Sequence, residues 1–344
     1  MKHPFALPSC LLLGFLLCIQ GSCWAATSFY VASVGVASQS PEERAKAAAV
    51  GLQEILWRVT GSKITEQTPG LAGVFKQPET YLDSFQYAAG TDNNPQQVVL
   101  QFSPQSILQL TQTYHLAFWP ENRPKVLVWL VQSQAGQPDS FIRDANDTTV
   151  KKLQEAAKLR GLTLAFPNWD ADDLAALRPA QLISGDKEAL MNASFRYSLD
   201  TLLVGALNDT TSRWRLDHRG EQQTLTDVDP AVGLHTMADM LARTYALGKA
   251  TGGNTSSTAV IAVEVRDFLT YYNLMNYLTR QAQVASAKLI EAQPQRLIVE
   301  LSLRGNLPQF DKGLSLDRQL EPLAPNSGDI GTRENPVPYR WLSK

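Results

Sequence analysis

Side chains that commonly carry out catalysis or bind metals are few in this sequence, and they follow no familiar pattern. The three histidines beyond residue 25 are His115, His218 and His235, and no two of them have the spacing of metal ligands. Neither a Gly-x-Ser-x-Gly nucleophile motif nor a Gly-x-x-x-x-Gly-Lys phosphate loop is present. The sequence therefore predicts no catalytic residue, no metal ligand and no cofactor, and it leans away from an enzyme of a known class.

The densest acidic cluster comprises Asp170, Asp172 and Asp173. A calcium loop beginning at Asp170 would need glycine at its sixth position and glutamate at its twelfth, where the chain has Ala175 and Gln181. Aspartate is a preferred residue at helix N-termini. We therefore interpret this cluster as a helix cap.

Three arginines, Arg58, Arg123 and Arg196, each lie at the end of an apolar segment. In one interpretation each guanidinium pairs with a carboxylate or clamps backbone carbonyls. In the other it forms an anion or peptide site. These arginines are the candidate binding or structural residues of the sequence, together with Trp341.

Trp341 belongs to an apolar stretch, residues 336–342, within a C-terminal region rich in proline, asparagine and glycine. The stretch either docks as a strand on its own protein or serves as a motif that binds a partner, because exposed aromatic side chains lower solubility unless they are used.

The first 25 residues have the pattern of a secretory signal peptide. Lys2 gives a polar start, residues 11–19 are apolar, and Ala25 ends a small-x-small cleavage motif. A lipoprotein signal is disfavoured because Gln20 stands where an apolar residue should precede Cys23. All three cysteines lie in this segment, so we expect no disulfide in the mature chain. The expected location is the periplasm, after secretion across the inner membrane.

The remaining composition is that of a globular protein of several domains. The chain has 344 residues, of which 44% are hydrophobic and 19% are charged. No later run approaches the roughly 18 apolar residues of a transmembrane helix. Without Lys2, 30 basic and 33 acidic residues remain, so we expect no attraction to nucleic acid.

Residues 26–120 predict an N-terminal α+β domain with the order β-α-β-β-α. A strand at residues 28–37 leads to a helix that begins at Ser40-Pro41 and ends at Gly61. Two alternating strands, near residues 81–87 and 98–102, form a hairpin, and Ser103 begins a second helix.

Residues 121–250 predict a central α/β domain with a mixed sheet. The run 125–131 is continuously apolar, which is typical of a strand buried on both faces. A helix at residues 147–160 and a strand at 162–166 complete a βαβ unit. A strand at 201–205, an edge hairpin at 213–228 and a closing helix at 234–245 follow.

Residues 251–258 have the composition of a flexible linker. Residues 259–314 then predict a C-terminal α+β unit, again with the order β-α-β-β-α, in which residues 297–303 show the clearest alternation in the chain. Residues 315–344 predict a mostly disordered tail.

Motifs in the first two domains carry a family resemblance. They are Arg58-Val59-Thr60-Gly61, Arg123-Pro124 with the following Val-Leu-Val-Trp-Leu, and the run 195–205 leading to Trp214-Arg215-Leu216. The chain resembles the proteobacterial secreted family known as domain of unknown function 2066. That resemblance implies an envelope protein without an assigned activity, so no functional residue is carried over.

Two hypotheses of function remain open. In the first, the protein is a periplasmic binding or scaffold module that presents sheet edges and its tail to another envelope protein. In the second, it binds a small molecule or is a hydrolase of unrecognised class. Its site would then lie at the C-terminal ends of the central strands, around Gln132, Pro167 and Ala206.

Overall fold

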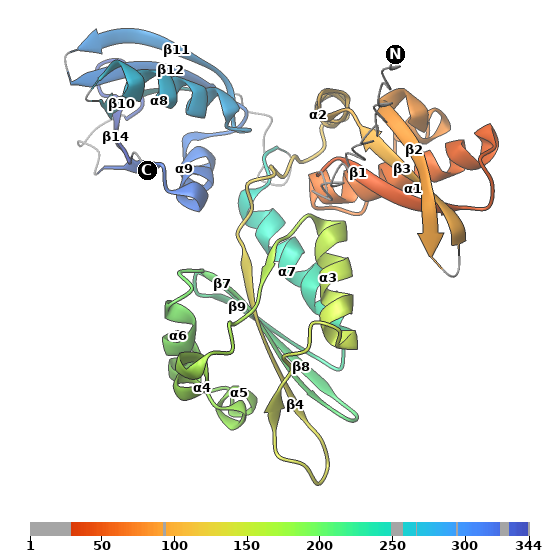
Figure 1. The fold of residues 1–344 in the computed structure, drawn as a ribbon. Helices are drawn as coiled ribbons and strands as arrows, with labels where there is room; N and C mark the ends of the chain where they lie inside the picture. Colours follow the sequence, from red (N-terminus) through yellow and green to blue (C-terminus); the bar gives the residue numbers. More distant parts are fainter. Residues whose placement is uncertain are drawn as a thin grey trace, which may run out of the picture.

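The computed structural model describes residues 29–91, 94–248, 257–265, 267–293, 295–323 and 330–342. Within these ranges the chain forms three units of mixed helices and strands, each built on its own sheet (Figure 1). The predicted fold class is confirmed. The predicted signal peptide and residues 251–256 of the predicted linker lie outside the described residues. No helix in the described ranges is long and apolar enough to cross a membrane.

The first unit follows the predicted order β-α-β-β-α, with two short 3-10 turns added. Its elements are β1 (Val31–Val36), α1 (Pro41–Thr60), η1 (Val74–Lys76), η2 (Pro78–Tyr81), β2 (Leu82–Thr91), β3 (Asn94–Phe102) and α2 (Pro104–Thr113). The sheet is antiparallel, with the strand order β1-β3-β2.

Helix α1 begins and ends where its sequence indicates. The Ser40 side chain accepts a hydrogen bond from the Glu43 amide, and Gly61 ends the helix in the left-handed conformation at φ 73°. Between these caps, Leu52, Ile55 and Leu56 are fully buried against the sheet. The apolar face of α1 therefore supplies much of the core of the first unit.

The central unit is larger and has helices on both faces of its sheet (Figure 1). Its elements are β4 (Val126–Ser133), β5 (Ser140–Phe141), α3 (Thr148–Arg160), β6 (Leu164–Ala165), α4 (Ala171–Ala176), α5 (Pro179–Ser184), α6 (Lys187–Phe195), β7 (Thr201–Asn208), β8 (Ser212–His218), β9 (Glu221–Thr226) and α7 (Pro230–Tyr245). The strand order is β5-β4-β7-β8-β9, with β6 also paired to β4, and β4 runs parallel to β6 and β7.

Strand β4 is buried on both faces, as its continuously apolar sequence predicts. Val128 and Leu130 pack in the core beneath α3 and α7. Leu127 and Trp129 pack in the separate core on the side of α5 and α6, where the Trp129 indole donates to the Ser194 hydroxyl at 3.1 Å. One strand thus supplies two cores, because successive side chains point to opposite faces.

The third unit contains β10 (Ser257–Glu264), α8 (Phe268–Arg280), β11 (Val284–Gln293), β12 (Arg296–Leu303), α9 (Leu307–Asp317), β13 (Leu320–Pro322) and β14 (Val337–Trp341). Its strand order is β11-β12-β10-β14-β13, with β14 parallel to β10. The unit therefore includes strands from the region that the sequence predicts to be a tail.

The prediction of a mostly disordered tail over residues 315–344 is wrong for much of that region. Strand β14 lies between β10 and β13, Tyr339 is fully buried, and its hydroxyl hydrogen bonds to Asp311. The region therefore docks as a strand on its own protein, which is one of the two alternatives for Trp341. The surrounding proline and glycine content hides this strand, since its stability comes from pairing with residues about 75 positions away.

The first and third units repeat one topology. In each, the first strand pairs antiparallel with the last strand of the β-α-β-β-α order, which in turn pairs antiparallel with the middle strand. The order β1-β3-β2 thus corresponds to β10-β12-β11. The units differ at the outer edge of the first strand: among the described residues, β10 carries an added strand there, β14, and β1 does not.

Candidate functional site

Arg58, near the end of α1, is tied into the junction between the first and central units. Its Nη1 donates to the carbonyls of Phe29, at 2.8 Å, and Val31, at 3.0 Å. Its Nε donates to the Leu159 carbonyl at 3.3 Å, and its Nη2 pairs with Glu54. The side chain is buried and each guanidinium nitrogen has a protein partner, so these bonds leave little capacity for an external anion.

Arg123, in the segment that joins the two units, forms a second set of bonds at the same junction. Its Nη2 donates to the carbonyls of Arg58, at 2.6 Å, and Trp119, at 2.9 Å, and its Nη1 donates to the Arg160 carbonyl. The guanidinium lies 3.6 Å from the centre of the Trp119 ring. Burial lowers the pKa of Arg123, and the nearby charges of Arg160 and Arg58 lower it further.

Arg160, the last residue of α3, completes this group, and the sequence analysis did not identify it. Its Nη2 donates to the Gly61 carbonyl at 3.0 Å and to Asp239 Oδ1 at 2.7 Å. Its guanidinium lies 4.9 Å from the centre of the Trp57 ring. We call Arg58, Arg123 and Arg160 the arginine clamp, because together they bond backbone carbonyls of both units.

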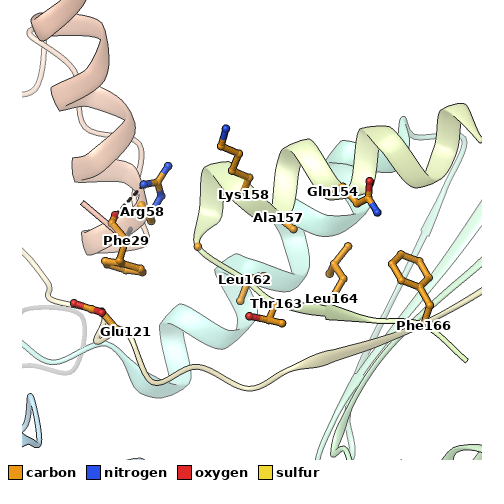
Figure 2. A pocket seen from close by; sticks show the side chains of 11 residues that line it. Phe29, Arg58, Glu121, Gln154, Ala157, Lys158, Leu162, Thr163, Leu164 and Phe166 are labelled. Atoms are coloured by element: carbon orange, nitrogen blue, oxygen red, sulfur yellow. Dashed lines mark hydrogen bonds between the residues drawn. The ribbon is translucent and has the colours of Figure 1, made fainter. Parts of the chain in front are cut away.

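A cleft of about 760 Å³ opens beside the arginine clamp (Figure 2). One wall is formed by Phe29 and Arg58 of the first unit, and the other by α3 and the chain that follows it, including Leu164 and Phe166. Glu121 lies at this cleft, and burial raises the pKa of its carboxyl group. Arg58 is already bonded within the protein, and the other basic side chain that lines the cleft is Lys158 of α3.

Arg196, after α6, lies elsewhere and pairs with the acidic cluster. Its Nη1 contacts Asp170 Oδ1 at 2.7 Å and Asp173 Oδ1 at 3.1 Å, and its Nη2 contacts Asp170 Oδ2 at 2.9 Å. Asp170 also caps α4 by accepting from the Asp173 amide, as the helix-cap interpretation predicts. The bond to Arg196 holds the pKa of Asp170 below its usual value.

Trp341, at the end of β14, is half-buried and lies 5.2 Å from the Tyr277 ring, measured between ring centres. Arg58, Arg123, Arg196 and Trp341 therefore do not form one site. Only Arg58 and Arg123 are brought together.

The histidines are also dispersed. His218 is buried, with Nδ1 2.8 Å from the Thr201 hydroxyl and Nε2 3.0 Å from the Tyr245 hydroxyl. His235 lies against Trp57, with 4.8 Å between ring centres. Across the described ranges, no three histidine, cysteine or acidic side chains are grouped to hold a metal ion.

An apolar groove of about 650 Å³ lies where α6 leads into β7, and we name it the Phe195 groove. Its apolar lining comprises Met191, Phe195, Leu199 and Leu202. Phe195 is 86% exposed, the highest value among the large exposed apolar side chains of the described residues. In the sequence, this segment stood out only as a family motif. The available signal was a phenylalanine and a methionine four residues apart, near the end of a helix.

The polar rim of the groove joins the central unit to the third unit. Arg219 pairs with Asp200 at 3.3 Å and donates to the Ser315 hydroxyl at 3.2 Å. Arg318, just after α9, is exposed and also lines the groove. None of the side-chain bonds found among the described residues involves the Arg318 guanidinium. A neighbouring cleft of about 280 Å³ continues from this rim to Lys125.

The backbone of the groove is unusual. Ser198, Arg219 and Arg318 all line it, and all three have left-handed backbones, with φ values of 52°, 51° and 55°. Arg318 is the left-handed C-cap of α9, and Arg219 lies in the tight turn between β8 and β9. These two conformations therefore follow from the local turns.

A comparison with protein families matches the first unit. Residues 25–120 match a family described as a domain of unknown function (DUF8605). The resemblance to domain of unknown function 2066 is therefore wrong, because the matched family is a different one. Short motifs around buried strands and helix ends recur for structural reasons, which explains why they misled. No curated protein matches the chain.

Proposed function

We propose that this protein is a non-enzymatic binding or scaffold module of the cell envelope, and that the Phe195 groove holds an extended segment of a partner protein. The main observation in support of this proposal is that Phe195 is 86% exposed at the edge of an apolar groove. An exposed aromatic side chain beside other apolar side chains is typical of a docking surface.

The charges at the rim support a partner segment that carries a carboxylate next to an apolar side chain. Asp200 is already paired with Arg219, and the second carboxylate of the lining, Asp217, accepts from the Gly220 amide and the Gln222 side chain. Arg318 and Lys125 extend from the rim and the adjoining cleft. An apolar side chain would cover Phe195 and Leu199 while a neighbouring carboxylate meets Arg318. Burial of one such side chain is worth about 1.5–3 kcal/mol.

The proposed location rests on the N-terminal segment. The matched family domain begins at residue 25, at the cleavage site predicted for the signal peptide, which supports export of the folded part. A small-molecule site at Gln132, Pro167 and Ala206 is less favoured, since none of the three lines the cleft beside the arginine clamp or the Phe195 groove.

The test begins with a photo-crosslinking amino acid at position 195 of the full chain in its native cells. The matched control places it at Leu269, which is 65% exposed on the third unit. The crosslinked segment of the partner is then synthesised, and its affinity for the purified protein is measured. We expect a partner that crosslinks at 195 and not at 269, with an acidic residue beside the crosslinked apolar one.

Variants then separate specific binding from incidental contact. Phe195→Ser should weaken the synthesised segment at least about 10-fold, in line with the loss of one buried apolar side chain. It should leave the unfolding midpoint unchanged because the side chain is exposed. Arg318→Gln should reduce both the affinity and its dependence on salt. The proposal fails if Phe195→Ser leaves the affinity unchanged, or if positions 195 and 269 crosslink the same proteins.

A further inference from the structure

Positively charged side chains gather in the cleft of about 280 Å³ that continues from the rim of the Phe195 groove, and we name it the basic cleft. Its charged lining comprises Arg123, Lys125, Arg219, Arg318 and Asp200. Four cations therefore line a cleft that has one carboxylate, in a chain whose formal net charge is -2. Such a local excess of positive charge attracts anions.

Half of these cations are already bonded to groups of the protein. The Arg123 guanidinium donates to four backbone carbonyls at the arginine clamp. Arg219 pairs with Asp200 at 3.3 Å. By contrast, the hydrogen bonds and ion pairs found among the described residues include none from the side chains of Lys125 and Arg318, and both residues are exposed. These two side chains are therefore available to a ligand.

The two available cations belong to different units. Lys125 directly precedes β4 of the central unit, whereas Arg318 is the C-cap of α9 in the third unit. Leu316, near the end of α9, packs against the core of the central unit, and this contact brings Arg318 to the cleft. Because like charges that line one cleft repel each other, an anion bound between them would turn a repulsion between the units into an attraction.

The other polar side chains of the cleft narrow the choice of anion. Thr201 and His218 are bonded to each other at 2.8 Å, so they are not available to a ligand. The Ser198 hydroxyl also lines the cleft and has no side-chain hydrogen bond within the described ranges. One ammonium, one guanidinium and one hydroxyl suit the several oxygens of a phosphate group. Its charge of about -1.5 to -2 at neutral pH matches two cations better than a single carboxylate does.

We propose that the basic cleft binds a phosphate group, free or as a small monoester, and that the bound group joins the third unit to the central unit through Lys125 and Arg318. The ammonium and the guanidinium would each hold a phosphate oxygen, and Ser198 would donate to another. Arg318 also lines the Phe195 groove, and its five N–H donors allow it to serve both places. The site does not depend on the partner segment proposed for that groove.

The first test titrates the full chain with inorganic phosphate by calorimetry at pH 7.5, with sodium chloride keeping the ionic strength constant. Lys125→Gln should weaken phosphate binding at least about 10-fold, because one charge-assisted bond is lost. Lys151→Gln, which removes the same charge from the exposed face of α3, is the matched control and should bind phosphate as the natural protein does. Phe195→Ser should also leave this affinity unchanged, which separates this proposal from the proposed function.

A second measurement tests whether phosphate joins the two units. Amide hydrogen exchange of α9 should become slower when phosphate is added to the natural protein, because Arg318 at its end is then held against the central unit. Lys125→Gln should abolish this protection although it changes the central unit alone. Arg318→Gln should weaken phosphate binding and remove the protection as well.

The same phosphate group could come from a soluble monoester or from a lipid headgroup, and two further probes distinguish them. Binding of glycerol phosphate that depends on Lys125 indicates a soluble ligand. Sedimentation with phosphatidylcholine vesicles only when they contain phosphatidic acid, again dependent on Lys125, indicates a lipid. The proposal is overturned if inorganic phosphate does not bind, if Lys125→Gln binds it as well as Lys151→Gln does, or if α9 gains no protection.

Discussion

At the scale of single residues, the arginines show how an expected binding group becomes structural. A guanidinium offers five N–H donors and no acceptor, so it suits a place where several carbonyls converge. Arg123 occupies such a place and donates to carbonyls of Arg58, Trp119 and Arg160. Its role is to satisfy backbone groups of two units at once.

Replacing Arg123 by glutamine should lower the free energy of unfolding by about 2–3 kcal/mol, since carbonyls at the junction lose charged donors. Arg123→Lys should recover only part of this loss, because a single ammonium group cannot reproduce the planar fork. Urea unfolding measures both variants. Lys151→Ala, on the exposed face of α3, is the control and should be near neutral. If Arg123→Gln leaves the free energy of unfolding unchanged, the proposed structural role of the arginine clamp is wrong.

His218 is a single residue that makes the free energy of unfolding depend on pH. Burial lowers its pKa from the ordinary value of 6.5, and the charge of Arg219 acts in the same direction. The unfolded chain therefore takes up a proton first as the pH falls, and the folded state loses stability below about pH 6.5. Asp170 and Asp186, whose pKa values are lowered, lose their stabilising effect only at a pH below the ordinary aspartate value of 3.8.

This pH dependence can be isolated with His218→Gln. Urea unfolding of the natural protein and the variant at pH 7.5, 6.5 and 5.5 should show a difference that shrinks toward acid pH, because only the natural protein is penalised for keeping His218 neutral. His235, whose pKa is lowered in the same direction, titrates in both proteins and cancels. A difference that is constant over this range would refute the assignment.

At the scale of elements, helix ends determine how the units meet. Gly61 ends α1 and Gly161 ends α3, both in the left-handed conformation, and both lie at the arginine clamp. At Gly161 an added Cβ would lie 2.7 Å from Phe29 Cε2 and 2.9 Å from Arg58 Cγ. The glycine is thus required by its φ value and by the contact between the units.

Gly161→Ala should therefore destabilise the protein more than the same substitution at a left-handed glycine that has open space around it. Gly136 provides the matched control, since its φ is 77° and an added Cβ would meet nothing within 4 Å. We expect a loss of about 1 kcal/mol for Gly136→Ala and about 2–4 kcal/mol for Gly161→Ala, from strain plus overpacking. Chemical denaturation measures both losses. Equal losses would mean that the contact between the units adapts freely.

At the scale of the whole molecule, the three units are joined in different ways. The first and central units form one block, and the third unit forms another. The arginine clamp ties the first and central units together through bonds to backbone carbonyls of both. The third unit meets the central unit near the end of α9, where Arg219 donates to the Ser315 hydroxyl. We expect the first two units to unfold together and the third to unfold separately.

Tyr339→Ala should destabilise the third unit alone, by about 3–5 kcal/mol, because it removes a fully buried aromatic side chain from β14. Trp57, Trp119, Trp129, Trp169 and Trp214 all lie in the first two units. In a chain that begins after the predicted cleavage site, and so lacks Trp24, tryptophan fluorescence in a Trp341→Phe background reports on those two units. Its midpoint should stay unchanged in the Tyr339→Ala variant while circular dichroism shows an earlier transition. A shift of the fluorescence midpoint would show that all three units unfold as one.

The sequence by itself determined the local elements. Capping residues such as Ser40 and Asp170, the apolar run of β4 and the alternation in β12 act within a few positions, so each could be recognised without the rest of the chain. The repeated order of the first and third units was also predicted from these local patterns. The predicted family was wrong because similar short motifs arise wherever the same local packing is needed.

Only the tertiary structure decided which distant groups meet. Strand β14 is ordered because β10 and β13 lie on its two sides, a pairing that its proline-rich sequence does not indicate. The bonds between Arg58 and Leu159, and between Arg160 and Gly61, join residues about 100 positions apart. The Phe195 groove likewise needs α6, β8 and the end of α9 together. Such sites depend on packing between elements, and a linear pattern records each element separately.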